Sequence, residues 1–168
     1  MYIELIHQMK KMLGQIDTWL TTTAAHADAK KVEPAVFLGL RLAPDQFPLS
    51  RQIQIACDTA KVAAARLAGQ EAPKHADTET TIAELQDRVR SVIAYLEGFS
   101  AKDFADGATR VISQPRWEGK TMTGADYFVE HSVPNFFFHA TTAYAILRSN
   151  GVTLGKRDYL GKRTMSAA

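Results

Sequence analysis

The sequence predicts an all-α fold: a four-helix bundle with a long first crossover and a small β-hairpin before the last helix. Apolar residues recur every three or four positions through most of the chain, which is the spacing of one helix face. Proline and glycine interrupt this pattern at only a few places. The 168 residues, 46% hydrophobic and 23% charged, also have the size and composition of one soluble domain with a single core.

The first two helices are separated by a proline-containing segment. The first is predicted over residues 3–25, with one apolar stripe formed by Ile3, Ile6, Met9, Leu13, Ile16 and Leu20. Prolines exclude one continuous helix over 32–49. We therefore predict a packed connection whose buried side consists of Phe37, Leu38, Leu40, Leu42 and Phe47. The second helix is predicted over 48–68, with proline in its first turn and glycine after its end.

The third helix and the hairpin follow from local signals. Thr81 and Glu84 have the spacing of a capping box, so a helix begins there. Its core stripe consists of Ile82, Leu85, Val89, Val92, Leu96 and Phe99. The segment 107–119 instead contains strand-forming residues and a Glu118-Gly119 turn, which predicts a short hairpin.

The last helix is predicted over residues 123–150. Asp126 complements the exposed amides and the dipole at its amino end, and Gly151 ends it. Pro134 lies inside this helix and cannot donate a hydrogen bond to the carbonyl of Glu130. A local kink is therefore expected near the middle of the helix.

Several functional classes are excluded by composition and charge. A net charge of +2 gives no basic surplus for nucleic acid, and the single Cys57 excludes an internal disulfide or a cysteine-rich zinc site. The amino end lacks the features of a secretory signal, and the nearly uncharged stretch 132–147 is too short and polar to span a bilayer. We expect a cytoplasmic protein without membrane or nucleic-acid partners, with one domain over 1–161 and a flexible tail over 162–168.

The last helix carries the candidate catalytic residues. Tyr127, His131, Asn135 and His139 follow one another at steps of four and share one helix face. On this pattern His139, His131 and Asn135 are candidates for catalysis, and Tyr127 for substrate binding. A histidine on a core-facing stripe also has a structural interpretation, as a hydrogen-bonded core residue. His131 and His139 lie about 12 Å apart along a straight helix, too far to share one metal ion.

The second helix contains a polar ridge formed by Arg51, Gln54, Asp58 and Lys61. One interpretation is a solvated face, because charged side chains normally stay wet. In the other, the ridge faces inward, so that Gln54 and Asp58 meet His139 and bind substrate. His75 lies in polar loop sequence and is expected at the surface.

Four stretches together resemble a known family: residues 45–58, 66–69, 134–148 and 155–161. The stretch Pro134-Asn-Phe-Phe-Phe-His is the most specific of them. They are similar to an uncharacterised bacterial domain-of-unknown-function family of the DinB/YfiT-like superfamily, whose four-helix members are candidate metalloenzymes. The resemblance covers residues 6–161 and implies the DinB-like bundle and a homodimer.

The wider superfamily commonly holds a divalent metal with one histidine on the second helix and a His-x-x-x-His pair on the last. Carried over by position, Asn135 and His139 occupy the pair, so asparagine replaces the first histidine. Residues 49–68 contain no histidine. His139 is the one standard metal ligand left, so we expect any divalent metal to bind weakly, and the cofactor stays open.

Three functions follow from these observations. The first is binding or conversion of a small molecule in a pocket between the second and fourth helices, near His139. The second is a non-catalytic structural or interaction protein that forms a homodimer. The third is a divalent-metal-dependent hydrolase or transferase, which the resemblance implies. The sequence names no substrate and does not decide whether the protein is an enzyme.

Overall fold

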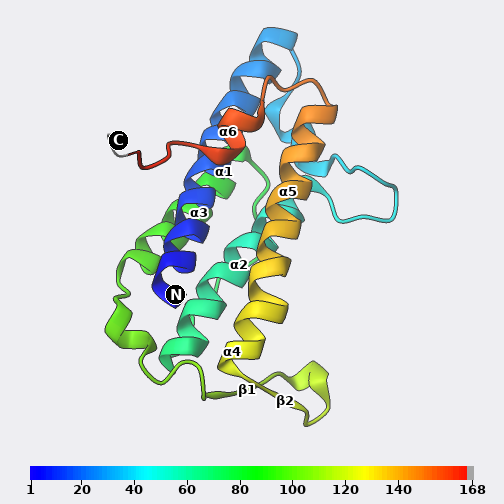
Figure 1. Ribbon diagram of the computed structural model, residues 1–168. Helices are drawn as coiled ribbons and strands as arrows, with labels where there is room; N and C mark the ends of the chain where they lie inside the picture. The colour runs from blue at the N-terminus through cyan, green and yellow to red at the C-terminus, as the bar shows by residue number, and fades with distance from the viewer. Residues whose placement is uncertain (166–168) are drawn as a thin grey trace.

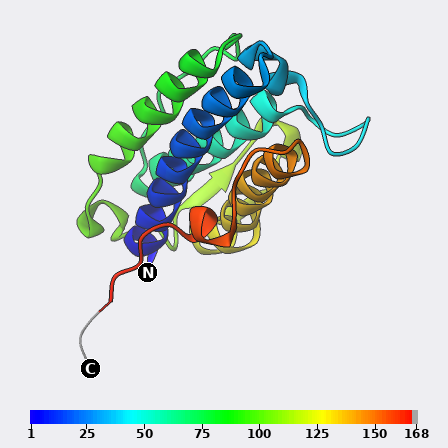
Figure 2. The same cartoon turned by 90° about the horizontal axis from the view of Figure 1, so that it is seen from above.

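Four long helices form a bundle in the computed structural model, which describes residues 1–165 (Figure 1). They are α1 (Tyr2–Lys30), α2 (Leu49–Ala68), α3 (Ile82–Glu97) and α5 (Val133–Ser149). α2 packs against α3 and α5, while α1 packs against all three of the other long helices. Figure 2 shows α1 passing between α3 and α5. The all-α four-helix bundle is confirmed.

The core is built from the predicted apolar stripes. The five stripe residues that lie on α3 are buried, as is Phe99 just after its end, and five of the six on α1 are buried. α2 contributes small side chains, which let its neighbours approach closely: Ala56, Cys57, Ala60, Ala63 and Ala64. Burial raises the pKa of the Cys57 thiol to about 12, so this cysteine packs in the core and forms no thiolate at neutral pH.

α1 is longer than predicted, because it continues beyond residue 25 to Lys30. The added turn contains alanines, which favour helix, and Ala27 is buried in the core. The helix ends where Lys31 adopts a left-handed backbone with φ of 56°, and its N–H bonds to carbonyls of the last turn. Thus the end is set by a left-handed cap on a lysine, which the sequence does not mark.

The crossover from α1 to α2 contains the short 3₁₀ helix η1 (Pro34–Gly39). Phe37 and Leu38 are buried, as expected. However, Leu42 and Phe47 are 46% and 55% exposed, so their predicted burial is wrong. The N–H of Leu49 bonds to the carbonyl of Leu40 at 2.9 Å, which closes the intervening residues into a loop that projects from the bundle (Figure 1).

The capping box at the start of α3 forms as predicted. The amide of Glu84 donates to Thr81 Oγ1 at 3.1 Å, and the amide of Thr81 donates to Glu84 Oε2 at 3.0 Å. After α3, the chain passes through η2 (Ala101–Phe104) to the hairpin. The two capping-box hydrogen bonds join residues only three apart, so the sequence sufficed to locate them.

The hairpin consists of β1 (Val111–Ser113) and β2 (Thr121–Thr123), which pair antiparallel with Ile112 opposite Met122. The short helix η3 (Pro115–Trp117) and a turn with positive φ at Glu118 and Gly119 connect them. The hairpin is therefore present, but its second strand lies beyond residue 119. The Glu118-Gly119 turn lies in the connection between the two strands.

The last helical element begins at Thr123, as predicted. The Thr123 hydroxyl accepts from the Asp126 amide at 3.1 Å, and the Asp126 carboxylate accepts from that hydroxyl at 2.6 Å. The element comprises α4 (Gly124–Asp126), the π-helical turn η4 (Tyr127–Ser132) and α5. The wider turn directly precedes Pro134, which lacks an N–H and would crowd the carbonyl four residues earlier in a regular α-helix. The chain thus meets the proline with a π turn instead of one continuous α-helix.

The carboxyl-terminal segment returns to α1 through α6 (Lys156–Leu160). The indole of Trp19 donates to the carbonyl of Asp158 at 3.1 Å, and the ring of Tyr159 stacks on it at 5.8 Å. The predicted flexible tail begins after this element at 162, and its residues 166–168 lie outside the described residues. Within residues 1–165, no helix is both long and apolar enough to cross a membrane.

Candidate functional site

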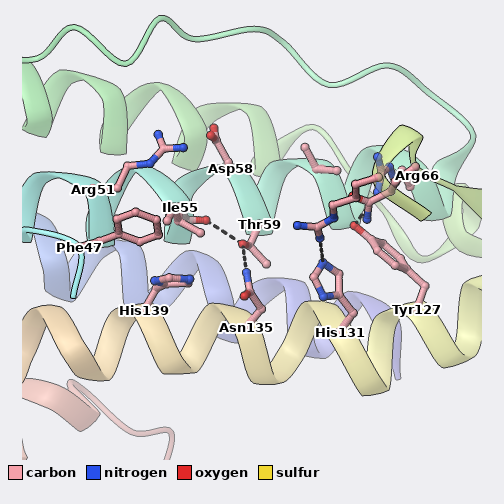
Figure 3. A pocket seen from close by; sticks show the side chains of 13 residues that line it. Phe47, Arg51, Ile55, Asp58, Thr59, Arg66, Tyr127, His131, Asn135 and His139 are labelled. Carbon is pink, nitrogen blue, oxygen red and sulfur yellow. Dashed lines mark hydrogen bonds between the residues drawn. The ribbon is translucent and has the colours of Figure 1, made fainter. Parts of the chain in front are cut away.

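An open cleft of about 540 Å³ lies between α2 and the last helical element (Figure 3). Its volume falls in the range of small-molecule sites. The lining combines polar and apolar side chains: Phe47, Arg51, Ile55, Asp58, Thr59, Val62, Arg66, Gln114, Arg116, Tyr127, His131, Asn135 and His139.

All four candidate residues of the last helix line this cleft: Tyr127, His131, Asn135 and His139. In a regular α-helix, each step of four rotates a side chain by about 40° around the axis. The π turn holds more than four residues per turn, so the step from Tyr127 to His131 falls short of a full turn and offsets part of that drift. The turn before Pro134 thereby keeps the four side chains on one face.

His139 is held in one orientation by Gln52 of α2. Its Nδ1 lies 2.7 Å from Gln52 Oε1, while Gln52 Nε2 donates to the carbonyl of Phe47 at 2.9 Å. Because the amide oxygen can only accept, Nδ1 of His139 carries the proton and Nε2 is left as an acceptor. Burial lowers the pKa of His139, and the charge of Arg51 lowers it further. The ring is therefore neutral at pH 7, with a basic nitrogen.

Asn135 is oriented by Thr59 of α2. The Asn135 side-chain amide donates to Thr59 Oγ1 at 2.8 Å, and that hydroxyl donates to the carbonyl of Ile55 at 2.7 Å. Since the amide nitrogen faces Thr59, the Oδ1 atom is the one left to accept a hydrogen bond from a ligand. Figure 3 shows Asn135 midway along the cleft, between His131 and His139.

His131 and Tyr127 meet arginines at the other end of the cleft. Arg116 Nη2 lies 3.3 Å from His131 Nε2, and Arg66 Nη1 donates to the Tyr127 hydroxyl at 3.1 Å. Burial lowers the pKa of His131, and Arg116 and Arg66 lower it further. This end therefore holds a neutral histidine between two cations.

The polar ridge of α2 divides between two sides of the helix. Asp58 lines the cleft, but its carboxylate pairs with Lys61 and Arg88, both at 2.8 Å. Gln54 is not among the cleft residues, and its amide donates to Glu79 at 2.8 Å. The prediction that Gln54 meets His139 is therefore wrong, because Gln52 holds that position.

The solvated-face interpretation is also wrong for Gln54 and Lys61, which are buried. The connection between α2 and α3 covers them. Its His75 Nδ1 lies 2.6 Å from Lys61 Nζ and its Nε2 lies 2.8 Å from Ser91 Oγ, so His75 is half-buried instead of exposed. The sequence places His75 in a polar loop, but it does not show that the ring contacts Lys61 and Ser91.

Arg51 and Asp58 of α2 line the cleft and belong to the predicted ridge, but the other polar residues of α2 that serve the cleft were not predicted. Gln52, Thr59 and Arg66 are spaced by seven, with Ile55 and Val62 between them, which is the pattern of one straight helix face. The seven-residue spacing of these polar residues is the sequence signal that marks the cleft face of α2. The predicted polar ridge is displaced by one residue along the helix, and only two of its members, Arg51 and Asp58, line the cleft.

A buried arginine anchors the other side of α2. The Arg88 side chain is 1% exposed and bonds to Asp58 and Asp77 at 2.8 Å and to Glu79 at 2.9 Å. Burial would lower the pKa of the guanidinium, but the bond to Glu79 and the nearby carboxylates outweigh it and raise the pKa. Arg51, which lines the cleft, also pairs with Asp77. This network supports the cleft from behind.

The donor set does not fit the divalent metal site of the wider superfamily. Near His139 and Asn135, α2 places an amide and a hydroxyl, Gln52 and Thr59, where a metal needs an imidazole or a carboxylate. Among residues 1–165, no three histidine, cysteine, aspartate or glutamate side chains are grouped to hold an ion.

Metal content tests this disagreement directly. We expect protein purified without added metal to carry far less than one zinc, nickel or iron per chain, because one histidine with a neutral amide is a weak donor set. A chelator should leave the melting temperature unchanged. Elemental analysis and thermal unfolding measure both quantities. About one metal per chain that survives dialysis, and is lost in His139→Ala, would contradict the expectation.

The comparisons with known proteins place this architecture. A model of a domain of unknown function, DUF1993, matches residues 1–160. The chain belongs to the DUF1993 family. A crystal structure of a DinB family member protein from Shewanella denitrificans is 56% identical, covers 97% of this chain and 93% of its own, and superposes with a TM-score of 0.93. No curated protein matches the chain. The DinB-like resemblance is confirmed, while the roles expected of the site residues stay predictions.

The stability of this DUF1993 chain should depend on pH through three histidines. Burial is the first cause that lowers the pKa of His75, His131 and His139 below the ordinary value of about 6.5. The unfolded chain therefore binds protons more readily than the folded one, so the free energy of unfolding falls as pH decreases from about 7 to 5.

Urea unfolding at a series of pH values measures this dependence. The triple variant with asparagine at the three histidines should lose most of the slope between pH 7 and 5, whereas His7→Asn, at an exposed position, should keep it. Asp77 and Glu79 contribute little in this window. Burial would raise their pKa values, but hydrogen bonds from Arg51 and Arg88 to Asp77, and from Arg88 to Glu79, lower them, so their effect on stability begins only as the pH falls toward the unfolded values of about 4. An equal slope in the triple variant would refute the assignment.

Proposed function

We propose that this DUF1993 protein binds a small polar molecule in the cleft between α2 and α5. The observation that carries the proposal is the convergence of oriented polar groups on one cavity of ligand size. His139 and Asn135 each have one atom fixed by α2 and a second atom left for a ligand. A purely structural histidine or asparagine would be satisfied within the core instead.

The His139 end of the cleft favours ligand groups that donate hydrogen bonds. At one end, His139 Nε2 and Asn135 Oδ1 are acceptors, which suit a hydroxyl, amine or thiol of the ligand. Because the pKa of His139 is lowered, its Nε2 is neutral and can also take a proton from such a group at pH 7. His139 is therefore the candidate general base of any reaction in the cleft.

Binding can be tested by amide NMR with a set of small organic acids, amines, alcohols and amides. Compounds that bind as proposed should shift the amide signals of Thr59 and Asn135. Ile55→Trp should lower the affinity for these compounds about tenfold or more, because the larger side chain fills the centre of the cleft. Ala94→Trp, at an exposed position of α3, is the matched control and should bind as the unaltered protein does.

His139→Ala provides the second variant. This variant should lower the affinity for compounds that carry a hydroxyl or amine more than the affinity for compounds without a hydrogen-bond donor, because only the former donate to Nε2. If no compound of the set moves the cleft amides, or if Ile55→Trp binds all of them unchanged, the cleft is not a ligand site. The interaction-protein alternative would then replace this proposal.

The homodimer implied by the family resemblance stays a prediction. Light scattering should give about twice the 18.5 kDa chain mass. A measured mass equal to that of one chain at high micromolar concentration would contradict the homodimer. This measurement is independent of the cleft, because ligand binding there needs side chains of one chain.

A further inference from the structure

The cleft has a cationic end that draws on two separate segments. Arg66 comes from α2 and Arg116 from η3, and both line the cleft beside Tyr127 and His131. The guanidinium carbon of Arg66 lies 5.3 Å from the centre of the Tyr127 ring. Figure 3 shows Arg66, His131 and Tyr127 together at the end of the cleft away from His139.

Neither arginine at this end has an acidic partner. Among residues 1–165, Arg66 and Arg116 form no salt bridge, whereas Arg51 and Arg88 do. Asp58 is the one acidic side chain in the described lining, and it is paired with Lys61 and Arg88. Within the described residues, no acidic side chain forms an ion pair with the positive charge at the Tyr127 end.

The hydrogen-bonding groups at this end are nearly all donors. An arginine can only donate, so His131 Nε2 accepts from Arg116, and the neutral ring carries its proton on Nδ1. The Tyr127 oxygen accepts from Arg66, which leaves its O–H to donate. Guanidinium groups with unused N–H donors, a ring N–H and a phenol O–H are the groups that an oxyanion requires.

We propose that Arg66, Arg116, Tyr127 and His131 form a subsite for the oxyanion of the ligand, a carboxylate or a phosphate. The inference rests on the proposed function and deepens it, because it assigns the ligand to the small organic acids or phosphate esters. The acceptor end at His139 lies eight residues away, about 12 Å along the helix. One small anion therefore reports on this subsite alone.

The test is an NMR titration of the histidine ring signals with inorganic phosphate and, separately, with acetate, at an ionic strength held constant with sodium chloride. Either anion should shift the His131 ring signals saturably and raise the pKa of His131, because the anion offsets the charge of the two arginines. The His139 signals should move less and provide the internal reference. The anion that binds more tightly distinguishes a phosphate site from a carboxylate site.

Two variants and a control complete the design. Arg66→Gln and Arg116→Gln should each lower the affinity for the anion by about tenfold or more, since each removes a cation from the subsite. Arg148→Gln, at an exposed position of α5, should leave the affinity unchanged. The amide spectrum of each variant verifies that it is folded, and both arginines lie at the cleft surface instead of in the core.

The outcomes separate this inference from the proposed function. If neither anion moves the His131 signals, or if both arginine variants bind as tightly as the unaltered protein, the anion subsite is refuted. Neutral alcohols and amides need the cleft but not its charge. Their binding without an anion response would leave the proposed function standing, whereas an anion response without any neutral binder would support the subsite alone.

Discussion

Arg88→Met is expected to lower the free energy of unfolding by about 3 kcal/mol. Removing one partner of a buried ion pair costs about 3–5 kcal/mol, because the other charge stays buried without compensation. Here the Arg88 side chain is 1% exposed and bridges Asp58, Asp77 and Glu79. The lower part of the range applies, since two of these carboxylates are 37% and 39% exposed and water can solvate them after the change.

Urea unfolding followed by circular dichroism measures this loss. Arg90→Met is the matched control, because Arg90 lies on the same helix, is 56% exposed and pairs with Asp17, so its loss should cost under about 1 kcal/mol. Adding Glu79→Gln to Arg88→Met should recover part of the stability, because Glu79 is the least exposed of the three carboxylates. Equal stability of Arg88→Met and the unaltered protein would show that the network contributes nothing.

Leu85→Ala is expected to destabilise the bundle by about 2–5 kcal/mol. Leu85 is fully buried in the core face of α3, and alanine there removes apolar contacts and leaves a cavity among rigid neighbours. Val92→Ala, about two turns further along the same stripe, should act in the same direction with a smaller cost, since it removes fewer atoms.

The same unfolding experiment applies, with Asp87→Ala as the control on the exposed face of α3. A surface change of this kind should alter the free energy of unfolding by no more than about 0.5 kcal/mol. A Leu85→Ala protein as stable as its control would mean that α3 does not depend on this stripe. The circular dichroism spectrum of the folded state should remain predominantly helical in every variant.

The candidate site shows how far local pattern reaches. Tyr127, His131, Asn135 and His139 could be grouped from the sequence, because steps of four stay within one helix. Their partners could not. Gln52 faces His139 from α2, and Arg116 reaches His131 from the hairpin. Such contacts join residues far apart in the chain, and no spacing rule encodes which of two neighbouring ridges on α2 faces the last helix.

The sequence by itself determined the four-helix bundle, the capping box at Thr81, the helix start at Thr123 and the presence of a hairpin, because helical periodicity and capping depend on residues within one or two turns. Only the tertiary structure decided the carboxyl end of α1, the ends of the hairpin and the burial of Gln54 and Lys61. These features depend on the path of a connection or on packing against a distant element, where long-range contacts outweigh local preference.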